Sequence, residues 1–215
     1  MINSFSIIIA NTTRSILYLK ILKKNKLYPN NIVYLDNKKN GNIKKIILKK
    51  KFSKNKSKLK IFNSEEIDKK KILNYIKNLK DKYIIYSGYP GKIIKNKKIL
   101  KQKNFIHFHP GKLPFFKGST TIYYSILKYN KIFCTSLILN EKIDSGKILN
   151  ICRYPIPKNI REIDLKYDDK IRANNLLNLL KNSNKPNKKY KRTNQILPYF
   201  VIHPVLRSIV FKKHN

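Results

Sequence analysis

Apolar and polar positions along the first third of the chain predict alternating strands and helices. The continuous apolar run over 4–11 (SFSIIIAN) is typical of a strand that is buried on both faces. Residues 14–25 (RSILYLKILKKN) have helical spacing, and a second strand is expected over 31–36 (NIVYLD). The first helix has three candidate capping residues, Asn11, Thr12 and Thr13.

The next segment is dominated by lysine before the apolar pattern returns. Residues 37–60 predict a loop or a short edge strand. A helix is expected over 65–80, preceded by a capping box in which Asn63 pairs with Glu66. Residues 82–91 (KYIIYSGYPG) then predict a buried strand that ends in a glycine turn.

The second half continues the alternation. Residues 104–114 (NFIHFHPGKLP) predict a strand that leaves the sheet into a Pro-Gly loop, and 119–130 predict a helix with Ser119 as its cap. Residues 131–156 predict two strands around an Ile-Asp-Ser-Gly turn, and 164–182 a last long helix.

This order of elements favours an α/β fold. We expect an open, Rossmann-like, twisted and mostly parallel sheet with helices on both faces. We expect residues 1–185 to form the domain that carries the site and residues 186–215 to form a tail packed on it. No G-x-G-x-x-G pattern follows the first strand, so the dinucleotide fingerprint is absent from the sequence. Sheets of this kind place their sites at the carboxyl ends of strands.

Composition changes this picture little. The 215 residues include 49 Lys and Arg against 11 Asp and Glu, a formal net charge of +38. Such a charge attracts polyanions, but lysines occur in every segment and arginine is scarce, so we expect no nucleic-acid partner. No apolar run approaches the roughly 20 residues of a membrane span. The two cysteines, Cys134 and Cys152, are too few for a disulfide scaffold, and we expect a cytoplasmic protein.

Two histidines are the main candidates for catalytic or binding residues. His107 and His109 are two residues apart in the predicted strand, so they face the same way at its carboxyl end. Asp144, in the Ile-Asp-Ser-Gly turn, is the candidate carboxylate that would orient a histidine and raise its pKa. The residues alone leave three interpretations open: structural histidines bonded to the following turn, a metal site, or acid–base and oxyanion catalysis without a metal.

Residues 107–127 (HFHPGKLPFFKGSTTIYYSIL) and 134–149 (CTSLILNEKIDSGKIL) resemble the signature of the folate-dependent formyltransferases. That signature reads Asn-x-His-Pro-Ser-Leu-Leu-Pro, then a glycine, then Asp-x-Gly. In this chain it falls on His109, Leu113-Pro114, Gly118, Asp144 and Gly146. The resemblance spans roughly residues 83–150 and departs from the signature where His107 replaces asparagine and Gly111-Lys112 replace Ser-Leu. These departures leave open whether the chain is an active or a diverged member.

The resemblance implies a mechanism and a co-substrate. An amine would attack the formyl carbon of 10-formyltetrahydrofolate while His109 manages the proton and Asp144 orients and charges it. His107 would replace the amide that donates to the developing oxyanion, and no metal would be required. The folate would lie along one turn with the loop at 142–145 above its pterin, which gives the candidate binding residues Tyr89, Pro90, Gly91, Ile93, Lys142 and Ile143.

The acceptor follows by elimination among the subfamilies. The resemblance and the sequence after the first strand favour a small-molecule amine, namely a nucleotide-linked amino sugar for surface polysaccharide. The alternatives are an enzyme like methionyl-tRNA formyltransferase without its C-terminal domain, and a catalytically dead, basic nucleic-acid-binding protein. The sequence leaves open whether the chain acts as a monomer or a homodimer.

Overall fold

The computed structural model describes residues 2, 4–37, 57–182, 190, 198, 199 and 201–214. These residues form two compact units, Met1–His107 and Phe108–Asn215. The expected domain boundary at residue 185 stays a prediction. Within the described ranges, no helix is both long and apolar enough to cross a membrane.

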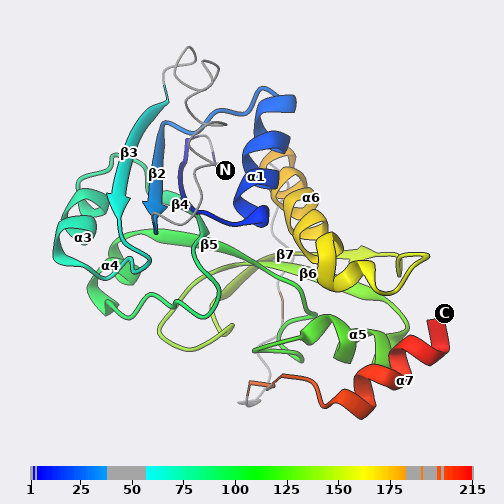
Figure 1. Ribbon diagram of the computed structural model, residues 1–215. Helices are drawn as coiled ribbons and strands as arrows, with labels where there is room; N and C mark the ends of the chain where they lie inside the picture. Colours follow the sequence, from blue (N-terminus) through cyan, green and yellow to red (C-terminus); the bar gives the residue numbers. More distant parts are fainter. Residues whose placement is uncertain are drawn as a thin grey trace. The chain divides into compact units, whose positions relative to one another are not determined.

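The first unit is built on parallel strands (Figure 1). Their order is β3-β2-β1-β4-β5, and each strand runs parallel to its neighbour. The strands are β1 (Ser6–Ala10), β2 (Asn31–Asp36), β3 (Lys58–Asn63), β4 (Tyr83–Ser87) and β5 (Asn104–His109), of which β5 continues into the second unit.

The burial of these strands explains their sequences. Every residue of β1 is buried, as are residues 32–36 of β2, because a parallel strand between covering helices has no solvent face. In β3 only Phe62 is buried, while Lys58 and Lys60 are exposed, as suits the edge of a sheet. A loop or short edge strand was predicted over 37–60, and the end of this range lies in the edge strand β3. Residues 38–56 of the predicted range lie outside the described part.

The described residues of this unit form the helices α1 (Thr13–Lys24), α3 (Lys70–Lys77) and α4 (Lys97–Gln102). Thr12 caps α1, because its hydroxyl accepts from the backbone N–H of Ser15 at 3.2 Å.

The predicted capping box of α3 is wrong. Asn63 ends β3, and the helix begins five residues after the predicted start with no side-chain cap at Lys69. Instead the hydroxyl of Ser64 accepts from the N–H of Glu66 at 3.0 Å. Glu66 is therefore part of a local turn before the helix. The six-residue helix α4 was not predicted, since it is too short to show helical periodicity.

The second unit begins with the end of β5 and continues the sheet in the order β5-β6-β7. Strands β6 (Ile132–Ile138) and β7 (Lys147–Tyr154) are antiparallel, as expected for a hairpin around the Ile-Asp-Ser-Gly turn. Its helical elements are α5 (Thr121–Tyr129), the π-helical turn η2 (Ile163–Tyr167), α6 (Asp168–Lys181) and α7 (Pro204–His214). The seven strands confirm the prediction of an open, mostly parallel α/β sheet.

The start of α5 differs from the prediction. Its N-cap is Thr120, with a left-handed backbone (φ 49°), and Ser119 precedes it. The Thr120 hydroxyl makes no cap bond and accepts instead from the N–H of Ile202 at 2.8 Å. A contact with a distant segment has therefore replaced the local cap.

Candidate functional site

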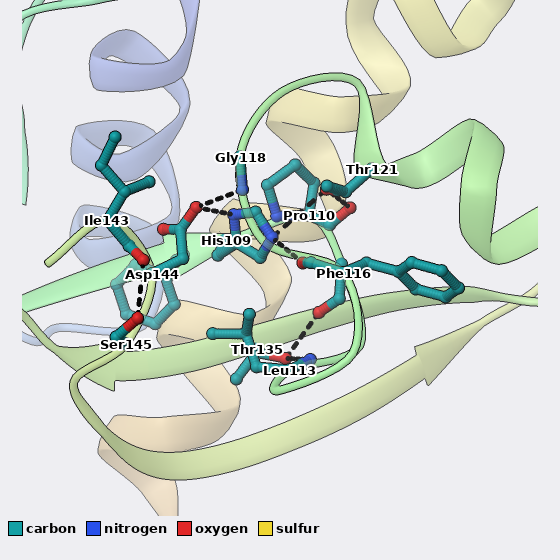
Figure 2. A network of polar contacts seen from close by, with 12 residues as sticks. His109, Pro110, Leu113, Phe116, Gly118, Thr121, Thr135, Ile143, Asp144 and Ser145 are labelled. Atoms are coloured by element: carbon teal, nitrogen blue, oxygen red, sulfur yellow. Dashed lines mark hydrogen bonds and ion pairs between the residues drawn. The ribbon is translucent and has the colours of Figure 1, made fainter. Parts of the chain in front are cut away.

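His109 is the last residue of β5 and lies almost completely buried, with 2% of its surface exposed. Its Nε2 lies 2.7 Å from the carbonyl oxygen of Phe116 and 3.3 Å from the hydroxyl of Thr121 (Figure 2). The carbonyl can only accept, and the Thr121 hydroxyl donates its proton to the Pro110 carbonyl at 2.9 Å. Nε2 therefore carries a hydrogen and donates it toward Phe116.

Asp144 faces the other ring nitrogen. Its Oδ2 lies 3.3 Å from Nδ1 of His109 and accepts from the backbone N–H of Gly118 at 2.8 Å. The residue sits in the turn between β6 and β7 with a left-handed backbone (φ 46°), and its side chain is 11% exposed. A Cβ on Gly146 would lie 1.7 Å from the carbonyl oxygen of Ile138, so only glycine lets the turn close here. The sequence-based prediction that His109 and Asp144 lie together agrees with this geometry.

Burial decides the charge of this pair. It lowers the pKa of His109 below the ordinary value, because removing the imidazolium from water costs more than the neighbouring Asp144 carboxylate returns. The carboxylate raises the pKa of His109, as expected, but it does not set the net direction. With a hydrogen fixed on Nε2, Nδ1 is the basic nitrogen of the neutral ring. A proton bound at Nδ1 would lie between the ring and Asp144.

The loop after His109 is held by its own polar contacts. The hydroxyl of Thr135 donates to the Gly111 carbonyl at 2.6 Å and accepts from the N–H of Leu113 at 3.2 Å (Figure 2). A Cβ on Gly111 would lie 2.7 Å from Nε2 of His109 and 2.9 Å from the Phe116 carbonyl oxygen. The glycine that departs from the family signature therefore leaves room for the loop to reach the histidine.

Arg172 is a residue of the site region that sequence reasoning missed. Its guanidinium donates to the carbonyl of Phe108, which directly precedes His109, at 2.7 Å. Two further bonds of 2.8 and 3.0 Å join it to Asp168 one turn earlier on α6. The i,i+4 spacing of Asp168 and Arg172 was readable in the sequence, but their contact with β5 was not.

The remaining predicted site residues are placed separately. His107 lies on β5, two residues before His109 and half-buried, as the last residue of the first unit. In that unit the Tyr89 hydroxyl donates to the Leu35 carbonyl at 3.0 Å and accepts from the N–H of Asn11 at 3.3 Å. Any contact of Tyr89 with a folate would thus be made by its ring.

The other candidate folate residues lie in two exposed turns. In the first unit, Pro90 and Gly91 (φ 72°) form a turn, and Ile93 is 54% exposed. In the second unit, Lys142 is exposed, and Ile143, next to Asp144, is 49% exposed. Their contacts with a folate stay predictions. Within the described ranges, no three His, Cys, Asp or Glu side chains are grouped so that they could hold a metal ion.

Comparisons with known proteins identify the family of the chain. The family model described as formyl transferase matches residues 5–175. Over 129 residues the chain is 33% identical to methionyl-tRNA formyltransferase of Campylobacter lari. The matched region covers 57% of this chain and 42% of that protein.

Solved structures share the fold at low identity. A sugar N-formyltransferase from Shewanella sp. superposes with a TM-score of 0.61 at 20% identity, covering 93% of this chain and 77% of that one. The formyltransferase PseJ from Anoxybacillus kamchatkensis gives a TM-score of 0.52 at 15% identity, covering 92% and 86%. That structure holds tetrahydrofolate and UDP-4,6-dideoxy-4-formamido-L-AltNAc.

Proposed function

Because the chain belongs to the formyl transferase family, we propose that it transfers a formyl group from 10-formyltetrahydrofolate to the amine of a nucleotide-linked amino sugar. The observation that carries the proposal is the buried pair of His109 and Asp144, 3.3 Å apart, at the carboxyl end of β5. A buried base next to a carboxylate suits proton transfer from an amine, and the pair lies within the family match.

The reaction needs one bond to form and one to break. The amine nitrogen forms a bond to the formyl carbon, and the bond between that carbon and N10 of the folate breaks. The attacking amine loses a proton, which Nδ1 of His109 can accept because Phe116 already holds the hydrogen on Nε2. Asp144 stabilises the protonated ring, and the proton then passes to the departing folate nitrogen.

Negative charge develops on the formyl oxygen during attack and requires a donor. In this proposal His107 supplies that donor, in the position where the family signature carries asparagine. An imidazole N–H donates as an amide does, so the chemistry survives the exchange.

The proposed folate site requires apolar surface beside the reacting atoms. In the second unit, Ile143 provides such a surface in the residue before Asp144, with 49% of it exposed. The folate would supply the formyl group, and Ile143 would pack against it next to Asp144.

Two observations support the amino-sugar acceptor. The names of two structural neighbours give a sugar N-formyltransferase and a complex with a UDP-linked formamido sugar. In addition, after β1 the chain carries Asn-Thr-Thr, where the glycinamide ribonucleotide transformylases resemble one another in a Gly-Ser-Asn loop. In this chain Thr12 is used to cap α1.

A second candidate acceptor is methionyl-tRNA. It is favoured by the relative from Campylobacter lari and by the net charge of +38, which suits a polyanion. The chain spans less than half of that relative, so the activity of the whole relative is a proposal for this chain.

One assay separates the two acceptors. The full chain is incubated with 10-formyltetrahydrofolate and either a panel of UDP- and dTDP-linked amino sugars or methionyl-tRNA. Tetrahydrofolate release and the mass of the acceptor are followed. We expect release that depends on an amino sugar, with a formylated product. Transfer to methionyl-tRNA alone would replace the first acceptor with the second, and the absence of both transfer and folate binding would refute the enzyme.

A further inference from the structure

We infer that Tyr199, in the C-terminal tail, is a positioning residue for the His109–Asp144 pair. This inference rests on the proposed function and extends it to a residue outside the family match, which ends at residue 175. Tyr199 is 90 positions after His109 in the sequence, yet both belong to the second unit. The loop 116–120 contacts both Tyr199 and the pair of His109 and Asp144.

Tyr199 pairs with this loop through its backbone. Its N–H donates to the Lys117 carbonyl at 2.7 Å, and its carbonyl accepts from the N–H of Ser119 at 3.0 Å. The two bonds form a parallel bridge opposite Gly118. They fix the peptide groups on both sides of that glycine.

The same loop supplies one partner to each member of the catalytic pair. The N–H of Gly118 donates to Oδ2 of Asp144, and the carbonyl of Phe116 accepts from Nε2 of His109 (Figure 2). The first contact orients the carboxylate, and the second selects Nδ1 as the basic nitrogen. A displacement of the loop would therefore disturb both groups at once.

Gly118 shows how closely the tail approaches. Its φ of +92° is a conformation that glycine adopts readily and other residues avoid. A Cβ at this position would lie 2.3 Å from the carbonyl oxygen of Tyr199 and 2.9 Å from its nitrogen. Both the backbone angle and the missing side chain are thus matched to the bridge.

The aromatic ring of Tyr199 packs against the loop at Phe116 and against helix α5. Its centroid lies 5.6 Å from that of Phe116, in an edge-to-face arrangement, and 4.5 Å from that of Tyr124 on α5. Such aromatic pairs stabilise packing beyond the effect of their buried area. Three residues later the N–H of Ile202 donates to the hydroxyl of Thr120, which fastens the other end of the loop.

The tail also offers a matched control. Phe211 on α7 packs its ring against Tyr123 on α5 at a centroid distance of 6.0 Å. Truncating Phe211 removes an aromatic contact between the same tail and the same helix, without touching the loop 116–120. A general loss of tail packing should therefore affect both positions, and a positioning role only Tyr199.

The test compares Tyr199→Ala, Tyr199→Phe and Phe211→Ala in the full-length chain. Two-dimensional NMR of the histidine ring nitrogens, with His109 assigned by substitution, reads the pair directly and needs no turnover. We expect the Nε2-protonated pattern of His109 in the wild type, in Tyr199→Phe and in Phe211→Ala. In Tyr199→Ala we expect that pattern to be lost to tautomer exchange, at a temperature where the melting curve shows a folded protein.

Turnover provides the second readout. We expect Tyr199→Ala to lower kcat about 10- to 100-fold with little change in KM, as a small misplacement of reacting groups does. Tyr199→Phe should restore the rate. Wild-type ring signals in Tyr199→Ala, or equal damage in Phe211→Ala, would overturn the inference. A wild type that transfers no formyl group would refute the proposed function, while the NMR comparison would still decide the role of Tyr199.

Discussion

The two ring nitrogens of His109 have different partners, and this difference determines its chemistry. The Phe116 carbonyl holds Nε2 as a donor, and Asp144 lies beside Nδ1. Burial keeps the ring neutral at a pH where an exposed histidine would begin to protonate, because the buried cation is poorly solvated. The site is therefore prepared to accept a proton rather than to give one.

The pKa of His109 leads to a prediction for stability. Because its pKa is lower in the folded chain than the value of about 6.5 in the unfolded chain, the unfolded state binds more protons below that pH. The stabilisation by neutral His109 is complete above about pH 6.5 and is lost as the pH falls toward the folded pKa. Urea unfolding between pH 5 and 8 should show a steeper loss in the wild type than in His109→Asn. Parallel curves would contradict the assigned direction.

Single residues also show what the sequence could reveal about the site. That His109 and Asp144 lie together was predictable, because both belong to a spaced signature. The partners that orient them were not, since two are backbone groups, the Phe116 carbonyl and the Gly118 N–H. Backbone groups are identical in every residue, so only the path of the chain places them.

At the level of secondary-structure elements, the loop after β5 provides the backbone groups that contact His109 and Asp144. Gly111 is central to it, because a Cβ there would lie 2.7 Å from both Nε2 of His109 and the Thr121 hydroxyl. A signature with serine at this position requires a different local arrangement of the loop.

Replacing this glycine should therefore damage the site. We predict that Gly111→Ala lowers kcat at least about 10-fold and destabilises the fold by about 1–3 kcal/mol, the usual cost of overpacking. Steady-state kinetics and denaturant unfolding measure the two effects separately. A Gly111→Ala protein with wild-type turnover would show that the loop shifts without consequence for His109.

The elements themselves were predictable to the extent that they are local. The strand at 31–36 was expected at the bounds of β2, where residues 32–36 are buried as in a strand inside a parallel sheet. The cap of α1 was narrowed to three residues, of which Thr12 is correct. The start of α3 was wrong, since Ser64 bonds to Glu66 locally, and the bridge of Tyr199 to Gly118 joins segments too far apart for any local pattern to reveal.

At the scale of the whole molecule, the charge of +38 and the site suggest different partners. A basic protein attracts any polyanion, whereas the buried pair of His109 and Asp144 is the arrangement that we propose for proton transfer. Family membership and the buried pair favour an enzyme, and the charge alone would favour a nucleic-acid-binding protein. Salt distinguishes the two, because non-specific binding to nucleic acid weakens steeply with ionic strength, while chemistry at a buried pair does not depend on it.

The most direct test of the account is the rate of acceptor-dependent tetrahydrofolate release by the wild type and by His109→Asn, at matched folded fractions. Removing a general base typically lowers the rate about 100- to 10,000-fold, and we predict a loss of at least about 100-fold in His109→Asn. Melting curves at pH 7.5 give the folded fraction of each protein. A His109→Asn protein that releases tetrahydrofolate at the wild-type rate would contradict the central claim.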